Sequence, residues 1–553
     1  MPTSQKMFAG ILWLTLIAVI TFFWFSVFRF SYNFPYYDDF ENIVKFIHDY
    51  SQTANIRAKL ALLFEQNFEH RVIFSKSVTL LQYFTTGQVN IKWLIILGDL
   101  SLIGILCFFI QYHFKKQLSL PALLTVTCLL FQVQHYEDSI SWATCALQHA
   151  PCIFFSLWSF YLALNRRNLY LSGSLALLAL FTSANGLSSI AIWLIIVLVN
   201  TADRRKVALP ALLLTVVTLV HILTLTIYSG SVLKHATSDI GPKFIFFLSF
   251  AGQIADPNMI GSMYPSVFLG ALFTLPIVIA GIAILTKKTR SITSVQWFCA
   301  AGILTLMFVD FLIVFARGTD ADAYGYRMDR YKIYAAFFAA LSIGFYDGYL
   351  NSLKYSMLPR LGIAASAFVF CLCSYYIYYG SMVSYQKTIE ANHYNFLWSK
   401  TIYYPAIYWD GATGEYMPDA SSTYLKNAVN AQDLNPAGME WDNLSDSVKV
   451  TASENSSYIS LSNADWQSQY APEKLYAIAI ESGSRQPRYL FSVESEYQRA
   501  VKIFVTTLNK PLSPGFNCRI YKTKLKPGNY DIYLLPIKKG RIIRPYKLRR
   551  ITV

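Results

Sequence analysis

The stretch that decides the fold lies near the N-terminus, where residues 7–30 read MFAGILWLTLIAVITFFWFSVFRF. These residues carry no charge before Arg29. A helix needs about 20 consecutive apolar residues to cross the hydrocarbon core of a bilayer. The run is too long for the core of a cleavable signal peptide, and it contains no small-residue cleavage site. We therefore expect residues 7–30 to form a retained first membrane span.

Comparable apolar runs recur through the first two thirds of the chain. Of its 553 residues, 54% are hydrophobic and only 14% are charged, whereas soluble globular proteins carry about 25% charged residues. The expected fold class is an α-helical polytopic membrane protein with about eleven transmembrane helices. After the first span, we predict the others at 91–112, 118–134, 150–165, 168–182, 186–200, 207–228, 264–286, 293–315, 332–349 and 360–380.

The loops between the predicted spans give the chain a direction. Every second loop is short and basic, and such loops remain in the cytoplasm. This alternation predicts a cytoplasmic N-terminus and an extracytoplasmic C-terminus. The net charge of +15 is then a topology signal rather than a sign of nucleic-acid binding. The five basic loops contain Lys115-Lys116, Arg166-Arg167, Arg204-Arg205-Lys206, Lys287-Lys288 with Arg290, and Lys354 with Arg360.

The composition changes after about residue 380, where spans cease and Asn, Ser, Asp and Tyr become common. We therefore divide the chain into a membrane domain, 1–380, and an extracytoplasmic β-rich or α+β domain, 381–553. Residues 381–440 look helical or irregular. The rest contains strand-like stretches joined by turns, and Pro527-Gly528-Asn529 is a strong turn signal within one of them. These stretches are RYLFSVES (488–495), RAVKIFVTTL (499–508), CRIYKTKLKPGNYDIYLLPI (518–537) and GRIIRPYKL (540–548).

The first outer loop, 31–90, contains the sharpest candidate for chemistry, the adjacent acids Asp38 and Asp39. Two carboxylates beside a membrane are costly unless they serve a cation, a proton or an acceptor hydroxyl. Either acid is suited to act as a general base on a sugar hydroxyl or to bind a divalent ion. The alternative is structural, with Asp39 capping a helix that begins near Phe40 and Asp38 solvated.

Two further groups on the same face are candidates for substrate contacts. Glu69-His70-Arg71 is suited to bind a phosphate through Arg71 and an acceptor through its neighbours, or it is a charged helix end in water. Glu137 and Asp138 lie about one helical turn before Trp142, so an acid and an aromatic plate share a face. Trp142 is suited to stack on a sugar ring, although tryptophan is also a common interface anchor.

The densest basic group on the outer face consists of Arg317, Arg327, Arg330 and Lys332. Positive charge is disfavoured there unless it has a partner. A phosphate or pyrophosphate would supply one, and arginine binds it in a bidentate manner. Pairing within the loop is the alternative, through the acids Asp320, Asp322 and Asp329.

Several other motifs are missing or incomplete. The eight cysteines form no zinc or disulfide pattern, although Cys145 and Cys152 are close in sequence. The sequence contains no Walker loop, no dinucleotide fingerprint and no HExxH motif. Acids within or at the ends of predicted spans have no matching basic residue in the spans, so they make a poor proton relay. These acids are Asp99, Asp310 and Asp347.

A first span followed at once by an acidic pair, many further spans and an outer C-terminal domain together resemble the GT-C glycosyltransferases. These enzymes take a sugar from a polyprenyl-phosphate carrier on the outer face of a membrane. The resemblance implies a base or metal ligand at Asp38 or Asp39 and a functional arginine–tyrosine pair at Arg330-Tyr331. The segment FTSANGLSSIAIWLIIVLVN (181–200) is similar to a stretch found in bacterial O-antigen glucosyltransferases.

The resemblance implies transfer of a hexose such as glucose to a surface polysaccharide or lipid-linked glycan in the bacterial inner membrane, with a periplasmic C-terminal domain. Arg71, Arg317, Arg327, Arg330 and Lys332 would bind the donor phosphate, and a divalent cation (Mg²⁺ or Mn²⁺) is compatible but not required. The alternatives are a transporter or flippase of lipid-linked sugars and a non-catalytic envelope assembly protein. Residues expected to contact the sugar or acceptor are Glu69, His70, Glu137, Trp142 and Tyr331.

Overall fold

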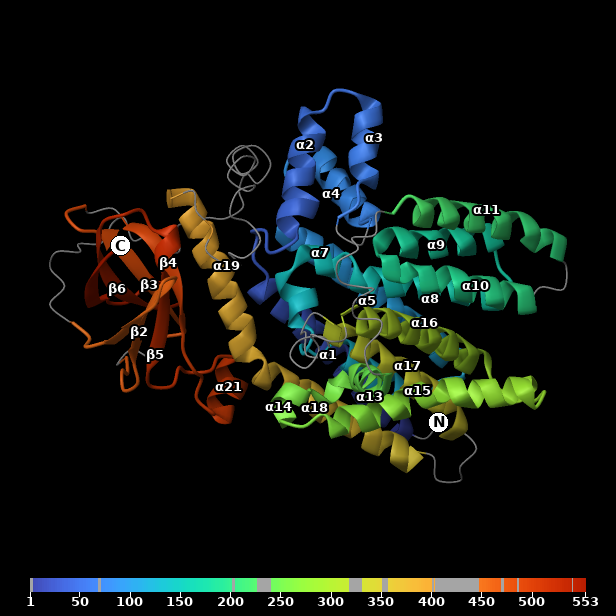
Figure 1. The fold of residues 1–553 in the computed structure, drawn as a ribbon. Coiled ribbons are helices and arrows are strands. Elements are labelled where there is room, and N and C mark those ends of the chain that lie inside the picture. The colour runs from blue at the N-terminus through green and yellow to red at the C-terminus, as the bar shows by residue number, and fades with distance from the viewer. Residues whose placement is uncertain are drawn as a thin grey trace. The chain divides into compact units, whose positions relative to one another are not determined.

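In a computed structural model, the chain divides into two compact units (Figure 1). We call them the helical unit and the sheet unit. The helical unit comprises Met1–Arg29, Glu41–Leu81 and Leu94–Tyr375, and the sheet unit comprises Phe30–Phe40, Gln82–Trp93 and Tyr376–Val553. The structure describes residues 3–67, 71–200, 204–225, 240–317, 331–350, 357–399, 402, 447–468, 472–484, 487–539 and 541–553.

Within the described residues, eight helical stretches are long and apolar enough to cross a membrane. Each coincides with one of the predicted spans, because hydropathy over about 20 residues is a local property. The helices are α1 (Thr3–Phe30), α5 (Ile91–Phe114), α8 (His149–Leu164) with the short α7 (Ala143–Ala146) before it, α11 (Arg204–Leu223), α15 (Tyr264–Leu285), α16 (Ser294–Arg317), α17 (Lys332–Leu350) and α18 (Met357–Ile377).

The other three predicted spans are shorter helices, α6 (Leu120–Leu130), α9 (Leu169–Thr182) and α10 (Leu187–Asn200). At 1.5 Å per residue they are only about 17 to 21 Å long, against a hydrocarbon core of about 30 Å. Ten consecutive residues of α6, from Pro121 to Leu130, are buried, so this helix belongs to the core of the helical unit. Eight of the eleven predicted spans are therefore helices long enough to cross a membrane, and the other three remain predictions.

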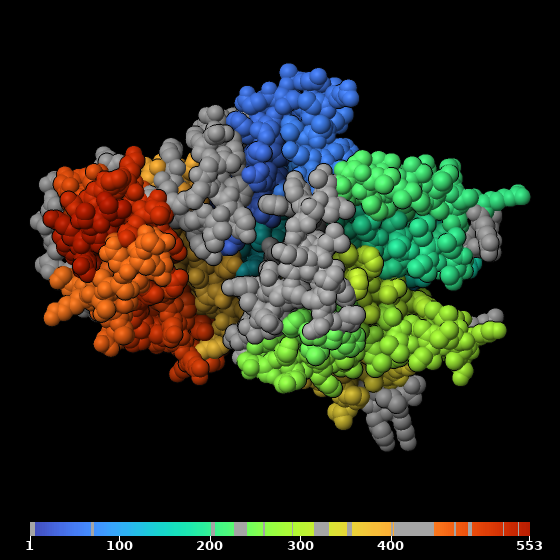
Figure 2. All heavy atoms as spheres, viewed as in Figure 1, coloured from blue at the N-terminus to red at the C-terminus, as the bar shows by residue number. Residues whose placement is uncertain are grey.

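The remaining helices are short. The first loop forms α2 (Phe46–Gln52), α3 (Ile56–Phe64) and α4 (Ile73–Thr86), and residues before α15 form α13 (Ile240–Ala251) and α14 (Pro257–Ile260). Helices α11 and α15 lie on the surface of the helical unit (Figure 2), and many of their exposed side chains are apolar, as lipid contact requires.

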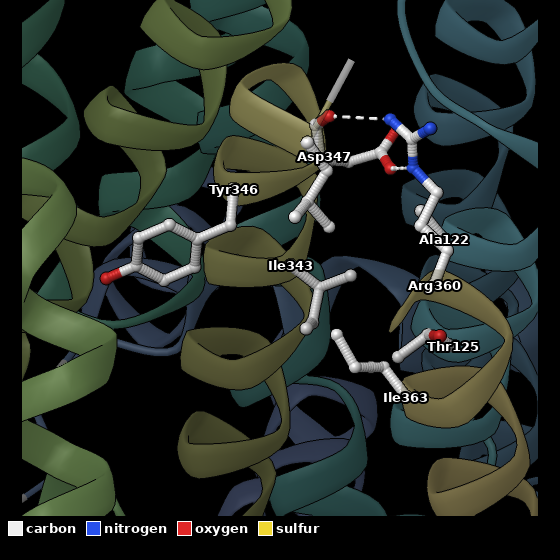
Figure 3. Close-up of a pocket in the computed structure, with 8 residues that line it drawn as sticks. Ala122, Thr125, Ile343, Tyr346, Asp347, Arg360 and Ile363 are labelled. Atoms are coloured by element: carbon white, nitrogen blue, oxygen red, sulfur yellow. Dashed lines mark hydrogen bonds and ion pairs between the residues drawn. The ribbon is translucent and has the colours of Figure 1, made fainter. Parts of the chain in front are cut away.

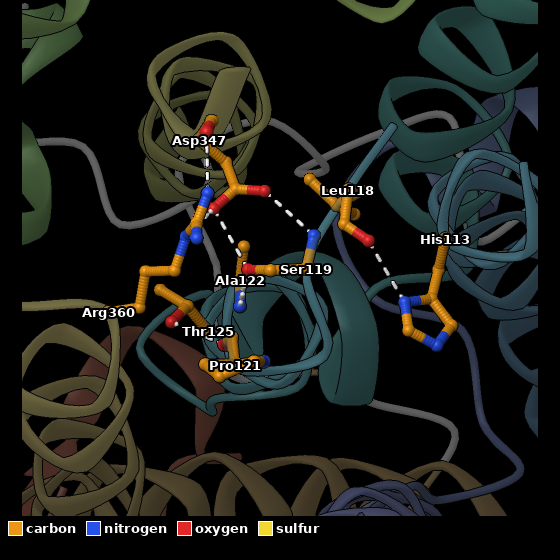
Figure 4. A network of polar contacts seen from close by, with 8 residues as sticks. All are labelled: His113, Leu118, Ser119, Pro121, Ala122, Thr125, Asp347 and Arg360. Atoms are coloured by element: carbon orange, nitrogen blue, oxygen red, sulfur yellow. Dashed lines mark hydrogen bonds and ion pairs between the residues drawn. The ribbon is translucent and has the colours of Figure 1, made fainter. Parts of the chain in front are cut away.

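An ion pair joins α17 to α18 (Figure 4). Arg360 Nε donates to Asp347 Oδ1 over 2.6 Å, and the other oxygen, Oδ2, accepts the backbone N–H of Ser119 over 2.7 Å. The Ser119 hydroxyl also donates to Asp347 and accepts the N–H of Ala122, which caps the start of α6. Asp347 thus has a basic partner after all, since Arg360 is buried rather than part of an exposed cytoplasmic loop.

A small cavity of about 30 Å³ lies beside this ion pair (Figure 3). It has room for only one or two water molecules. Its wall combines the charged pair with apolar side chains of α6, α17 and α18. The lining residues are Ala122, Thr125, Ile343, Tyr346, Asp347, Leu350, Arg360 and Ile363.

The sheet unit contains a β-sheet of eight strands in which all pairings between named strands are antiparallel. The order is β1-β2-β5-β4-β3-β6-β7, and β8 pairs with β6. This confirms a strand-rich C-terminal domain. The strands are β1 (Thr451–Glu454), β2 (Tyr458–Asn463), β3 (Lys474–Glu481), β4 (Pro487–Glu494), β5 (Phe516–Tyr521), β6 (Asn529–Lys538), β7 (Arg541–Ile542) and β8 (Tyr546–Thr552).

The central strands are buried on both faces of the sheet. Neighbouring side chains of a strand point to opposite faces, so they enter two different hydrophobic clusters. In β3, Leu475 and Ala477 enter one hydrophobic cluster, while Tyr476 and Ile478 enter another. Helix α19 (Tyr379–Ser399) covers the second face, where its Tyr394 joins that cluster (Figure 1).

One predicted strand, 499–508, is wrong. Its middle forms the short helix α21 (Val501–Thr507), in which Phe504 alone is buried. A strand at this place would need alternate residues to be buried, whereas Val501, Ile503 and Val505 are all exposed. The helix ends at Leu508, which adopts a left-handed backbone conformation with φ 53°.

Candidate functional site

The structure distinguishes the two adjacent acids of the first loop. The Asp39 carboxylate is fully buried, and its Oδ2 accepts the backbone N–H of Tyr36 over 3.1 Å. The Asp39 N–H in turn donates to the Tyr36 carbonyl over 3.0 Å, which closes a turn. Asp38 is only half-buried. Asp39 therefore holds the turn together, and Asp38 is the more accessible carboxylate.

The backbone of this turn is strained, and aromatic side chains hold it in place. Tyr37 has a positive φ of 45°, which is rare for a residue other than glycine. The Phe34 ring stacks on His393 of α19 at a centroid distance of 4.8 Å, and Tyr32 Oη lies 3.2 Å from His393 Nδ1. Burial lowers the pKa of His393 to about 4, so the ring is neutral at pH 7. Strained backbone supported in this way is common at functional sites.

Both acidic motifs of the predicted outer loops lie at π-helical segments. The first segment, η1 (Phe40–Lys45), follows Asp39 directly, and the second, η2 (Glu137–Ser141), begins with Glu137 and Asp138. A π-helix is rare, and single-turn ones are frequently found at functional sites. The structure thus gives the two acidic motifs a shared local geometry that the sequence did not reveal.

Three side chains that ligate metals come together around η2. Asp138 Oδ1 lies 2.5 Å from His149 Nδ1, and the ligand atoms of Asp138, Cys145 and His149 all lie within 4.8 Å of one another. All three residues are buried, and neither Cys145 nor Cys152 forms a disulfide. This cluster was not predicted from the sequence. Its signal in the sequence is three potential metal-ligating side chains within twelve residues; no single helical repeat joins them, because the extended backbone of Trp142 separates η2 from α7.

Two tyrosine rings, one just before α17 and one in its first turn, lie beside the His149 ring. The centroids of Tyr331 and Tyr334 lie 5.8 and 5.2 Å from that of His149. The Tyr334 hydroxyl accepts a hydrogen bond from the Asn185 amide over 3.0 Å. Tyr331, predicted to contact the acceptor, is therefore beside His149 and 7% exposed.

The predicted phosphate-binding group is only partly within the described residues. Lys332 is buried and forms an ion pair of 2.8 Å with Asp256, which is neither a phosphate nor one of the acids of its own loop. Arg317 ends α16, and its side chain lies outside the described residues. The predicted residues Arg327 and Arg330 lie outside them too, as do the acids Asp320, Asp322 and Asp329.

Arg71 already has partners in the helical unit. Its guanidinium donates to the carbonyl oxygens of His221 and Thr224 at the C-terminal end of α11, over 3.2 and 2.6 Å. Free carbonyls at a helix end attract a cation, so these bonds favour a structural role over phosphate binding. Burial lowers the pKa of Arg71.

The remaining predicted contacts are divided between buried and undescribed positions. Glu137 is half-buried at the start of η2, whereas Trp142 is buried within the helical unit. Glu69 and His70 lie outside the described residues. Of the acceptor contacts, Glu137, Trp142 and Tyr331 thus belong to the part of the helical unit around η2 and α17, and none of the three is exposed.

No protein-family model matches the chain, and no curated protein or solved structure is significantly similar to it. A functional assignment therefore depends on the residues and the geometry given above.

Proposed function

We propose that the chain is an integral membrane glycosyltransferase of GT-C type. It would move a hexose, such as glucose, from a polyprenyl-phosphate carrier to a surface polysaccharide or a lipid-linked glycan. The observation that carries the proposal is the strained, aromatic-lined turn that holds Asp38 and Asp39 directly after the first span. A carboxylate pair fixed at the end of a membrane helix suits deprotonation of a hydroxyl at the membrane surface.

The two acids would have different roles. Asp38, the half-buried carboxylate, would take the proton from the acceptor hydroxyl as that oxygen attacks the anomeric carbon. Asp39, which binds the backbone of Tyr36, would position the turn. A Mg²⁺ or Mn²⁺ ion is compatible with this pair of oxygen ligands, although general-base chemistry does not require one.

The departing polyprenyl phosphate needs positive charge to stabilise it. Arg327 and Arg330 keep this proposed role. Lys332 and Arg71 are weaker candidates, since Lys332 is paired with Asp256 and Arg71 binds the end of α11. The alternating basic loops support an extracytoplasmic site, with the N-terminus in the cytoplasm and the C-terminal domain in the periplasm.

The test replaces Asp38 in the full chain and measures the hexose content of the surface polysaccharide by mass spectrometry. Cells lacking the protein should lose one hexose per repeat, and the intact chain should restore it. Asp38→Asn should lower the transfer rate by about 10²- to 10⁴-fold, the usual contribution of a general base. The matched control is Asp49→Asn, which removes a carboxylate from α2 in the same loop and should leave transfer unchanged. Full transfer by Asp38→Asn would refute the assignment.

A lipid-linked sugar transporter is the second candidate, and one observation favours it. The Asp310 carboxylate in α16 is fully buried, and neither oxygen has a hydrogen-bond partner among the described residues. An acid at this depth in a span is a functional hypothesis by default. Purified protein in detergent distinguishes the two activities, because sugar transfer can be measured there and transport across a membrane cannot.

A further inference from the structure

The cluster of Asp138, Cys145 and His149 has the features of a metal site. The three residues come from η2, α7 and the first turn of α8, so a single continuous stretch of chain presents them on one side. Their exposed fractions are 1%, 4% and 6%. Buried polar side chains of this kind need partners, and a cation satisfies a carboxylate, a thiol and an imidazole at the same time.

The chemistry of the donor atoms selects the metal. A thiolate sulfur and an imidazole nitrogen suit Zn²⁺ and similar transition metals, whereas Mg²⁺ and Ca²⁺ prefer oxygen ligands. Three protein ligands with one further position is the usual arrangement of an open zinc site. The set therefore differs in kind from the Asp38-Asp39 pair, whose oxygen atoms alone would suit Mg²⁺ or Mn²⁺.

A second carboxylate lies close to the cluster and supports a cation there. The Asp99 side chain is 1% exposed, and its Oδ2 has no hydrogen-bond partner among the described residues. It lies near enough to Asp138 for their charges to interact. The neighbouring Gly98 allows α5 to lie close to α7, because a Cβ there would overlap the carbonyl oxygen of Ala146, next to Cys145.

We propose that Asp138, Cys145 and His149 bind a transition-metal ion, zinc by the nature of the ligands, and that Asp99 adds negative charge beside it. Zinc at about 2.1 Å from the nitrogen and the oxygen, and about 2.3 Å from the sulfur, would hold the nitrogen and oxygen about 3.4 Å apart in a tetrahedron. His149 Nδ1 and Asp138 Oδ1 are 2.5 Å apart, so binding separates them by about 1 Å. The cysteine binds as a thiolate, which releases its proton on binding.

The experiment measures metal in the purified full chain. Protein in detergent is incubated with zinc, dialysed against buffer and examined by inductively coupled plasma mass spectrometry. We expect equimolar zinc in the unchanged chain, and a large loss in Cys145→Ser and His149→Gln. Cys152→Ser is the matched control, because Cys152 is also a buried free thiol of α8 but lies outside the cluster; it should retain the metal. Asp99→Asn should bind zinc about 10- to 100-fold more weakly, as expected for a supporting residue.

Cobalt substitution keeps the test decisive if a variant folds poorly. Co²⁺ in the unchanged chain should show a thiolate-to-metal charge-transfer band, and Cys152→Ser should show it too, whereas Cys145→Ser should not. The proposal is overturned if the unchanged chain binds no zinc above background, or if Cys152→Ser loses the metal as completely as Cys145→Ser. Neither measurement uses sugar transfer, so the metal site and the proposed glycosyltransferase activity stand or fall separately.

Discussion

The buried cations of α17 and α18 differ from the buried lysine of α19 in the partner that each one meets. In the helical unit, Lys332 is paired with Asp256 and Arg360 with Asp347, so each of these buried cations faces a carboxylate. In the sheet unit, Lys387 of α19 is also buried, but its Nζ donates a hydrogen bond to the neutral carbonyl of Val493, over 2.6 Å. Desolvation, with a smaller effect from a nearby lysine, lowers its pKa to about 8. Lys332 and Arg360 are thus matched by opposite charge, whereas Lys387 more readily gives up its proton. Lys76 of α4 resembles Lys387: it is buried, donates to the carbonyl oxygens of Leu62 and Glu65, and has a pKa lowered by burial to about 8.

The largest effect should come from breaking an ion pair in the helical unit. Arg360→Met leaves the buried Asp347 carboxylate without its countercharge, and removing one partner of such a pair costs about 3–5 kcal/mol. Thermal unfolding of the purified chain in detergent measures this loss. Asp347→Asn combined with Arg360→Met should recover much of it, because no charge then remains. An unchanged unfolding temperature for Arg360→Met would show that lipid-facing helices tolerate an unpaired acid here.

The second-largest effect should be a pH dependence of the free energy of unfolding that comes from Lys387. The pKa of Lys387 is lower in the folded chain than its ordinary 10.5, so the unfolded chain binds the proton more tightly. Below about pH 8, the contribution of Lys387 to the free energy of unfolding should be constant and at its lowest. Between about pH 8 and pH 10.5 the free energy of unfolding should rise by roughly 3 kcal/mol. Urea unfolding across this range measures the rise.

Lys387→Met should flatten that rise, because the titrating group is gone. Lys502→Met removes an exposed lysine of α21 and serves as the control that keeps the pH dependence. Equal slopes for the two variants would mean that Lys387 is solvated and that it does not differ from the carboxylate-paired Lys332 and Arg360 in this respect.

The smallest effect is expected at the surface of the sheet unit. Lys522 Nζ and Glu454 Oε1 are 2.8 Å apart, but the Glu454 side chain is 60% exposed. Exposed ion pairs of this kind contribute about 0.2–1 kcal/mol, and salt screens them. Glu454→Gln should therefore change the urea midpoint only slightly at low salt and not at all at high salt. A loss comparable with that of Arg360→Met would erase the distinction between buried and exposed pairs.

Features that depend on neighbouring residues could be predicted from the sequence. The eight long helices follow from runs of apolar residues. Contacts between distant residues could not. Nothing local pairs Lys332 with Asp256, 76 residues apart, or places Arg360 against Asp347.

The sheet unit shows both outcomes. The turn signal at Pro527-Gly528-Asn529 marks the start of β6, as predicted. The β-branched residues of 501–507 suggested a strand, but their burial is that of a short helix. Strands β1 to β3 were missed, since their sequences were not separated from the irregular region before them.

The sheet unit gathers residues from both ends of the sequence, which has a consequence for biosynthesis. Tyr32 meets His393, 361 residues later, so the turn that carries Asp38 is made early and its packing partners are made last. At the usual 5–20 residues per second, translation separates them by roughly 20 to 70 s. During that interval the turn has its local bonds between Tyr36 and Asp39 but not the contacts of Tyr32 and Phe34 with His393. Ribosome stalling or premature termination after α18 would therefore leave a product in which residues Phe30–Phe40 have no α19 to pack against.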